Sequence, residues 1–156
     1  MKAWLGVALL CCAGLAGCGG GPVRRVSEPS ASVQQLTVHA DGTWSVDLRL
    51  QNYSSVPMRF DSISLAFDIG GQSAGTLAGQ PGLAIGPESA DVVTLALQPA
   101  SAARIAVAAA LAERRSLPYT LRGQVQAAPE DARARRYDIE RSSALSPVPG
   151  VPGVMR

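Results

Sequence analysis

Cys18 is one of three cysteines in this 156-residue chain, and the thiolate of a cysteine is a nucleophile that can be acylated. Cys18 stands directly behind residues 3–16, an apolar stretch that follows the basic Lys2. The stretch is shorter than the roughly 20 residues that a membrane-spanning helix needs. A basic start and a short apolar run are typical of a secretory signal peptide, which is removed from the mature protein. Cys11 and Cys12 would leave with it, so we expect neither a disulfide nor a cysteine-ligated metal site.

The residues before the cysteine add a more specific signal. Leu15-Ala16-Gly17-Cys18 resembles the lipobox of bacterial lipoproteins. The resemblance implies cleavage before Cys18, with a diacylglyceryl group on its sulfur and an N-acyl chain such as palmitate. An aspartate after the cysteine favours retention in the inner membrane in such lipoproteins, and Gly19 here implies the outer membrane, facing the periplasm. An ordinary secretory signal that happens to carry a cysteine near the cut is the alternative.

Arginines supply the cations that could contact an anionic surface. The candidates are Arg24 and Arg25 behind the expected cleavage site, and the later cluster Arg133, Arg135 and Arg136. For Arg24 and Arg25, the alternative is a solvated linker. For the later cluster, which has carboxylates interleaved with it, the alternative is a charged strand edge that resists aggregation. After loss of Lys2, 13 arginines face 12 carboxylates, and this near-neutral balance argues against binding of nucleic acid.

No other residues form a pattern typical of catalysis or metal binding. His39 is the one histidine, and no Gly-x-Ser-x-Gly turn accompanies it, so we expect a surface histidine and no catalytic residue. Asp61 and Asp68 stand seven residues apart on one expected strand, over roughly 20 Å, too far to share an ion. We therefore expect no metal, and no cofactor besides the covalent lipid on Cys18.

The elements that would position these side chains are mostly strands. Apolar residues alternate with polar ones in segments 33–39, 43–51, 63–69, 93–97 and 119–125. Two further strands are predicted at 72–77 and at about 137–139. Period-two alternation predicts strands with one buried face. Asp41-Gly42 and Gly70-Gly71 are hairpin turn signals. Ile105, Val107 and Leu111 fall at helical spacings, so residues 102–115 are predicted to form an amphipathic helix with Ser101 as its cap.

These features divide the chain into four parts. Residues 1–17 are the expected signal peptide, and residues 18–31 are the lipidated cysteine with a flexible Gly-, Ser- and Pro-containing tether. Residues 32–142 form the folded domain. Residues 143–156 hold Pro147, Pro149 and Pro152 among glycines and are predicted to be a disordered tail.

The turn Asn52-Tyr53-Ser54-Ser55-Val56-Pro57, the strand 63–69 with Gly70-Gly71 behind it, and the late helix resemble a late embryogenesis abundant (LEA) type 2 protein. This family is also called the water-stress and hypersensitive response (WHy) domain. It usually has Asn-Pro where this chain has Asn52-Tyr53. The resemblance implies a small antiparallel β-sandwich similar to a fibronectin type III or immunoglobulin domain. The alternating strands independently favour an all-β sandwich with one short helix between late strands, and an eight-stranded closed barrel is the alternative.

The combined expectation is a non-enzymatic lipoprotein that is held at a membrane by its lipid. The family resemblance implies a role in desiccation or envelope stress tolerance. Two alternatives stay open: an assembly or adaptor lipoprotein that binds an envelope protein by strand-edge pairing, and a module that binds a lipid or another apolar ligand between its sheets.

Overall fold

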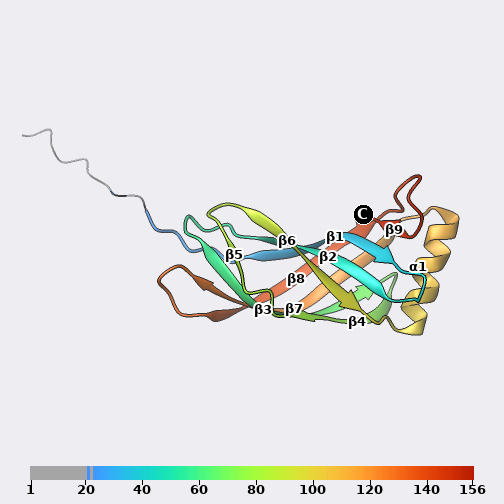
Figure 1. The fold of residues 1–156 in the computed structure, drawn as a ribbon, viewed down its shortest axis with the longest axis horizontal. Coiled ribbons are helices and arrows are strands. Elements are labelled where there is room, and N and C mark those ends of the chain that lie inside the picture. The colour runs from blue at the N-terminus through green and yellow to red at the C-terminus, as the bar shows by residue number, and fades with distance from the viewer. Residues whose placement is uncertain (1–20, 22) are drawn as a thin grey trace, which may run out of the picture.

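The computed structural model of the protein describes residue 21 and residues 23–156 (Figure 1). This part of the chain forms nine strands and one helix: β1 Ser30–Val38, β2 Trp44–Gln51, β3 Met58–Ile69, β4 Gln72–Gly79, β5 Leu83–Ile85, β6 Ala90–Leu97, α1 Ser101–Glu113, β7 Leu117–Pro129, β8 Arg135–Leu145 and β9 Val154–Met155. The strand pairs are antiparallel. The predicted all-β class with one helix between late strands is confirmed.

The strands form two sheets. One has the order β6-β2-β1-β9, and the other has the order β4-β3-β7-β8 with β5 paired to β3. The outer strands of each sheet do not pair with each other, so neither sheet closes on itself. The predicted sandwich is therefore confirmed, and the closed-barrel alternative is wrong.

The core lies between the sheets and follows from the period-two pattern. On β2 the side chains of Trp44, Val46, Leu48 and Leu50 are all buried, and on β3 the buried set includes Leu65 and Phe67. Because side chains on a strand point alternately to opposite faces, each strand presents one apolar face to the other sheet. A buried Leu or Phe side chain contributes about 1.5–3 kcal/mol to folding, so this face dominates the stability of the domain.

Gly123 lies on β7 between β3 and β8, and among the described glycines it leaves the least room for a Cβ atom. Its φ is +153°, and a Cβ atom added there would lie 2.2 Å from the carbonyl oxygen of Ser64. We expect Gly123→Ala to lower the free energy of unfolding by about 3 kcal/mol, because backbone strain and overpacking add at this position. Urea denaturation measures the effect. Gly86→Ala is the matched control, since its Cβ would meet only the Ser89 hydroxyl at 3.8 Å, and an equal loss in both variants would contradict the assignment.

The helix differs from its prediction at both ends and in its buried face. It ends at Glu113, with Arg114 as a left-handed C-cap, and does not reach residue 115. Ser101 is its first residue, and the N-cap is Ala100, which makes no side-chain capping hydrogen bond. The helix buries Ala103, Val107 and Ala110, whereas Ile105 is 70% exposed. The β3–β4 turn lies close to the helix at Ala106, where a small side chain fits. At Gly70 in that turn, an added Cβ would lie 3.3 Å from the Ala106 methyl group.

The prediction of a disordered tail at residues 143–156 is wrong. β8 continues to Leu145, and β9 pairs with β1 through Leu36 and Thr37. Ser146 and Arg156 exchange both backbone hydrogen bonds, at 2.5 and 2.8 Å, and close a hairpin whose loop holds the three prolines. Met155 is fully buried. Prolines cannot donate to a strand ladder, but here they occupy the loop, where no N–H is required of them.

The sandwich is elongated, with two distinct ends (Figure 1). At one end the chain enters from its N-terminal side, and there lie the turn at residues 52–57, the loop at 86–89 and the β7–β8 turn at 130–134. We call this the tether end. The opposite end is covered by α1 and the hairpin loop 147–153, and we call it the helix end.

Candidate functional site

A buried polar cluster organises the tether end. Asn52 follows β2 and is completely buried. Its Nδ2 donates hydrogen bonds to the carbonyl oxygens of Val56 at 2.9 Å, Ile85 at 3.2 Å and Gly86 at 2.9 Å. Its Oδ1 accepts the backbone N–H of Ser54 at 2.8 Å. Because a buried polar group is costly unless it is hydrogen-bonded, this one amide fixes the turn and the loop beside it in a single arrangement.

The chain that enters the domain is hydrogen-bonded to this turn. The Arg25 N–H donates to Ser55 Oγ at 2.8 Å, and the Ser55 N–H donates to the Arg25 carbonyl at 3.0 Å. The Ser27 N–H donates to Oγ of the buried Ser54 at 3.0 Å. The predicted flexible tether therefore ends before Arg25, and the prediction is wrong for residues 25–31. Composition suggested flexibility, but hydrogen bonds to Ser54 and Ser55 hold this segment on the domain.

Arg24 and Arg25, two of the predicted anionic-surface contacts, are paired with carboxylates of the domain. Arg25 NH2 lies 2.8 Å from Glu88 Oε1 and also donates to the Tyr53 carbonyl at 3.1 Å. Arg24 NH1 lies 3.7 Å from Asp131 Oδ2. All four charged side chains are largely exposed, so each pair is worth about 0–1 kcal/mol. The pairs orient the entering chain more than they stabilise the fold.

The two carboxylates occupy unusual backbone positions. Glu88 has φ 49° and Asp131 has φ 58°, in the left-handed region that glycine and asparagine favour. Arg114 at the end of α1, with φ 54°, is the third non-glycine residue with positive φ in the described part of the chain. A left-handed conformation costs roughly 1–2 kcal/mol for an ordinary side chain. At both carboxylate positions the chain thus places an acid beside a tether arginine at a conformational cost.

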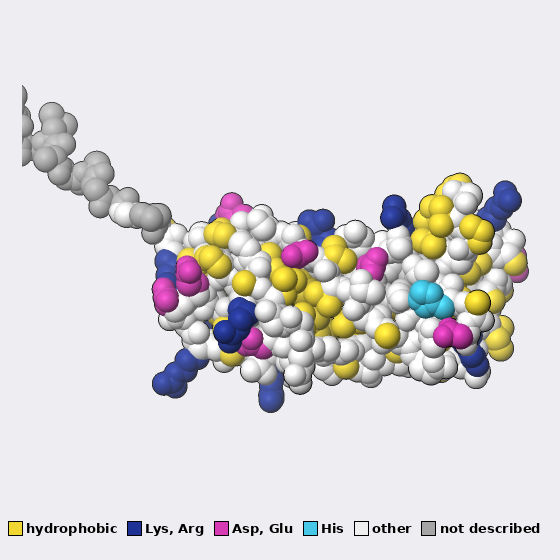
Figure 2. Space-filling view, viewed as in Figure 1, with side chains coloured by type: hydrophobic (Ala, Val, Ile, Leu, Met, Phe, Trp, Pro, Cys, Tyr) yellow, Lys and Arg dark blue, Asp and Glu magenta, His cyan; other side chains and the backbone are white. Residues whose placement is uncertain are grey.

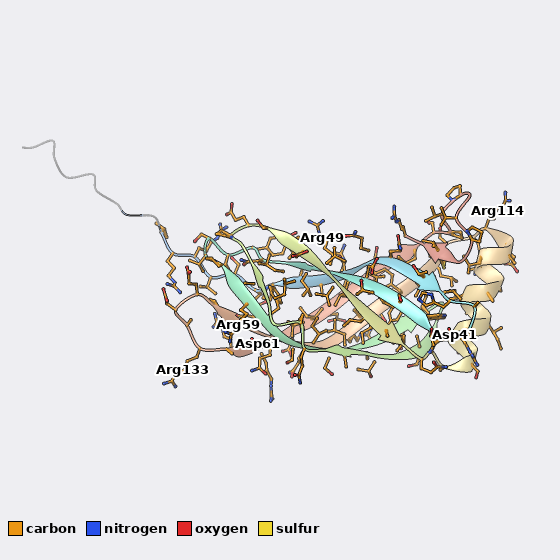
Figure 3. All side chains as sticks on the ribbon, in the orientation of Figure 1. Asp41, Arg49, Arg59, Asp61, Arg114 and Arg133 are labelled. Atoms are coloured by element: carbon orange, nitrogen blue, oxygen red, sulfur yellow. The ribbon has the colours of Figure 1, made fainter. Side chains whose placement is uncertain are left out.

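The other three predicted contacts lie near the same end. Arg133 is exposed in the β7–β8 turn, and Figure 3 shows it projecting beyond the sandwich. Arg135 is held by Tyr137, since its Nε donates to the phenol oxygen at 2.7 Å and its guanidinium lies 5.2 Å from the ring centroid. Arg136 follows it on β8 and is exposed. The fold therefore brings two groups of arginines to the tether end, and these groups are more than a hundred residues apart in the sequence.

Comparison with known proteins settles the family. The family model for late embryogenesis abundant protein, LEA type 2, matches residues 47–142, which is more than half of the chain. The chain belongs to the LEA type 2 family. The match begins on β2 and runs through β8, so it includes the Asn52 cluster.

Solved structures with similar folds are distant from this LEA type 2 chain. A crystal structure of a protein from Archaeoglobus fulgidus is 14% identical, with a TM-score of 0.44, over 80% of this chain and 98% of that one. A solution structure from Arabidopsis thaliana is 16% identical, with a TM-score of 0.47, over 80% of each chain. The putative ApaA protein from Bordetella pertussis is 16% identical, with a TM-score of 0.45, over 83% of this chain and all of that one. No curated protein matches the chain.

His39 has a serine neighbour but does not form a triad. Its Nε2 lies 2.7 Å from Ser45 Oγ. The nearby Asp41 carboxylate instead accepts the Thr43 hydroxyl at 2.6 Å and the Thr43 N–H at 2.9 Å, and these hydrogen bonds lower the pKa of Asp41 below its ordinary value of 3.8. A triad needs the carboxylate on the imidazole. Within residues 23–156 no group of three or more His, Cys, Asp or Glu residues is placed to hold a metal ion.

The lipid-attachment prediction lies outside the described residues, since these start at residue 21 and Cys18 precedes them. It stays a prediction. The described part of the chain contains no helix long and apolar enough to cross a membrane.

The sequence pointed to the arginines but not to their partners. Ser54, Glu88 and Asp131 carry no recognisable motif, and nothing in the local sequence shows that two acids adopt left-handed turns. Asn52 had a visible signal, because an asparagine directly behind an alternating strand is typical of a turn. Two of its three carbonyl acceptors, Ile85 at the end of β5 and Gly86 behind it, stand 33 and 34 residues later, so they have no local sequence signal.

We expect the pair of Arg25 and Glu88 to control how firmly the entering chain is held. Glu88→Asn removes the carboxylate but keeps a residue that tolerates the left-handed backbone. We predict unchanged global stability and about two- to threefold faster hydrogen exchange at the N–H groups of Ser27 and Ser55, which corresponds to an exposed ion pair of about 0.5 kcal/mol.

Nuclear magnetic resonance measures this exchange residue by residue. Glu140→Gln is the matched control, because it removes a carboxylate from another exposed pair, with Arg122, on β8. Unchanged exchange at Ser27 and Ser55 in Glu88→Asn would show that the ion pair does not hold the segment.

Proposed function

We propose that this LEA type 2 protein is a bacterial lipoprotein, anchored through a lipid on Cys18, whose non-enzymatic sandwich lies against the periplasmic face of the outer membrane. The observation that carries the proposal is the docking of residues 25–27 on the tether end. Six residues, 19–24, separate Cys18 from Arg25. They span at most about 20 Å when fully extended, so an anchor at Cys18 keeps the tether end close to the head groups.

The arginines at the tether end suit this orientation. A cation near an anionic membrane surface contributes about 1 kcal/mol. Arg24 and Arg25 are already paired with acids, which leaves Arg133 and Arg136 as the most available cations. Their contribution is small beside that of two or three acyl chains, so we assign them to orientation and the lipid to attachment.

A role by contact instead of by catalysis fits the chemistry of the described side chains. His39 and Ser45 lie on an exposed strand end, and the third group that would orient the imidazole is engaged with Thr43. The family to which the chain belongs suggests protection under desiccation or envelope stress. A strain that lacks the gene is expected to survive drying or osmotic shock less well than its parent. Survival at the parental level would contradict the stress role, while leaving the anchor untouched.

An assembly role is the second candidate, and the edge of the first sheet favours it. β6 has eight residues, pairs only with β2 among the described strands, and exposes Val92 by 38%. An open strand edge can accept a strand from another protein. Crosslinking in cells followed by purification separates the candidates. One stoichiometric protein partner that is lost in Val92→Pro would favour assembly, and the absence of such a partner would favour protection.

A further inference from the structure

The helix end carries a hollow of about 600 Å³ between the end of α1 and the hairpin loop. Leu111 and Arg114 line one side, and the loop residues 147–153 line the other. Its volume falls within the range of about 300–1,000 Å³ that is typical of small-molecule sites. A second hollow, of about 280 Å³, lies near Pro57 and Pro129 at the tether end. Neither of these two hollows lies between the sheets.

The walls of the larger hollow are mostly apolar and are fixed in place. The hairpin is pinned by the two bonds between Ser146 and Arg156, by the Val148 N–H to the Val154 carbonyl at 2.9 Å, and by burial of Met155. Three prolines restrict its loop further. Figure 2 shows apolar side chains gathered on this loop. The hollow is therefore preformed, and a ligand would not have to order it.

Arg114 supplies a cation at the rim. Arg114 is one of the residues that line the hollow, and Figure 3 shows it at the helix end of the sandwich, opposite Arg133. Within the described part of the chain, no carboxylate lies within ion-pair distance of Arg114, whereas its neighbour Arg115 is paired with Glu113 at 2.5 Å. Arg114 also keeps a left-handed backbone at the helix C-cap, where glycine is the usual residue. The chain thus retains an unpaired cation where a glycine would be more stable.

The lining selects against an extended peptide as the occupant. A peptide strand is bound chiefly through main-chain hydrogen bonds. Pro147, Pro149 and Pro152 have no N–H, and the N–H groups of Val148 and Val151 are used within the loop. The lining then consists mainly of apolar side chains, with the Gly150 and Gly153 backbone and the Arg114 guanidinium as its polar parts. Such a surface complements a molecule with an apolar body and a single anionic head.

We propose that this hollow is a binding site for a small apolar carboxylate of the fatty acid class, with the carboxylate on Arg114 and the chain against Leu111 and the loop. The site lies at the far end from the tether and goes beyond the proposed membrane-anchored role. Its test does not require the lipid anchor, so the binding proposal and the anchoring proposal can fail independently of each other.

The test is a titration of the full chain carrying Cys18→Ser, so that no covalent acyl chain competes for the hollow. Octanoate is the probe and octanol is its uncharged counterpart. Resonance shifts are expected at Leu111, Gly150 and Gly153 with octanoate, and binding of octanol is expected to be about tenfold weaker. Equal binding of both probes, or shifts elsewhere on the domain, would overturn the proposal. Tighter binding of an apolar peptide than of octanoate would reassign the hollow to a protein partner and overturn it as well.

Arg114→Gly separates binding from folding. Glycine relieves the left-handed backbone, so this variant is expected to melt at the same temperature or about 3 °C higher while octanoate affinity falls about tenfold. Arg115→Gln removes a neighbouring charge and should bind octanoate like the parent. Unchanged affinity in Arg114→Gly, or equal losses in both variants, would contradict the assignment of the carboxylate to Arg114.

Discussion

Asn52→Asp is expected to lower the free energy of unfolding by about 4 kcal/mol at pH 7, because it leaves a charge buried without a partner. The native amide donates to three carbonyl oxygens, and a carboxylate at the same place would face those oxygens with no hydrogen to give. Its only favourable contact would be the Ser54 N–H. Urea denaturation of the purified domain measures the loss.

The pH dependence of the free energy of unfolding of Asn52→Asp distinguishes burial of a charge from simple loss of the amide hydrogen bonds. Burial raises the pKa of the new carboxyl in the folded state above the ordinary value of about 3.9. The folded state then binds the extra proton, so the penalty is smallest below pH 3.9 and grows as the pH rises towards the raised folded pKa. Asn52→Ala is expected to lose about 2–3 kcal/mol with no such pH dependence.

Gln51→Glu is the matched control for Asn52→Asp. It makes the same chemical change one residue earlier, at a half-buried side chain that accepts a hydrogen bond from Arg49 and donates one to the Ser89 carbonyl at 3.0 Å. Both hydrogen bonds are exposed, so water can replace the lost partner and solvate the new charge. We expect a change within about 0.5 kcal/mol there. If Asn52→Asp were equally harmless, the buried amide would not be the organiser of the tether end.

Cys18→Ser is expected to move the protein from the membrane fraction to the soluble fraction almost completely. One acyl chain supports only a reversible association of about 10⁴ M⁻¹, whereas two or three chains hold a protein stably. Without them, the exposed arginines of the tether end offer a few kcal/mol at most and are screened by salt. Fractionation of cells followed by immunoblotting measures the distribution.

Cys12→Ser is the control for this experiment, since Cys12 lies in the segment expected to be removed and should leave the protein membrane-bound. Mass spectrometry of the mature N-terminus should find acyl chains on Cys18 in this control and none in Cys18→Ser. A Cys18→Ser protein that stays in the membrane fraction after washing in high salt would contradict lipid anchoring.

The sequence allowed the sandwich to be predicted because strand alternation is local information. The faces of β2 and β3 could be assigned from side-chain type alone, and Trp44 and Phe67 are buried as expected. The ordered hairpin at 146–156 could not be predicted, since its prolines suit a loop and a disordered tail equally well. Only pairing with β1, more than a hundred residues earlier, decides between them.

The candidate site was predictable only in part, because it too depends on contacts between residues that are distant in the sequence. Five arginines could be identified as cations, but their gathering at one end depends on β7 and β8 returning beside the entering chain. The left-handed turns at Glu88 and Asp131 are set by the loops around them and have no signature in residue type. On the helix, Val107 is buried as predicted but Ile105 is 70% exposed, because helical spacing alone does not show which face the strands will cover.

The proposed lipoprotein would stand with its tether end towards the head groups, and a fluorescence measurement can test this orientation directly. Single cysteines at Arg133 and at Ile105, each carrying a fluorophore, can report it, since the native Cys18 is expected to be blocked by lipid. β7 has 13 residues and runs between the two ends, which places the labels about 40 Å apart. With natively lipidated protein in vesicles that contain a head-group-linked quencher, we predict strong quenching at position 133 and little at position 105. Equal quenching at the two positions, or stronger quenching at 105, would contradict a sandwich that stands on its tether end.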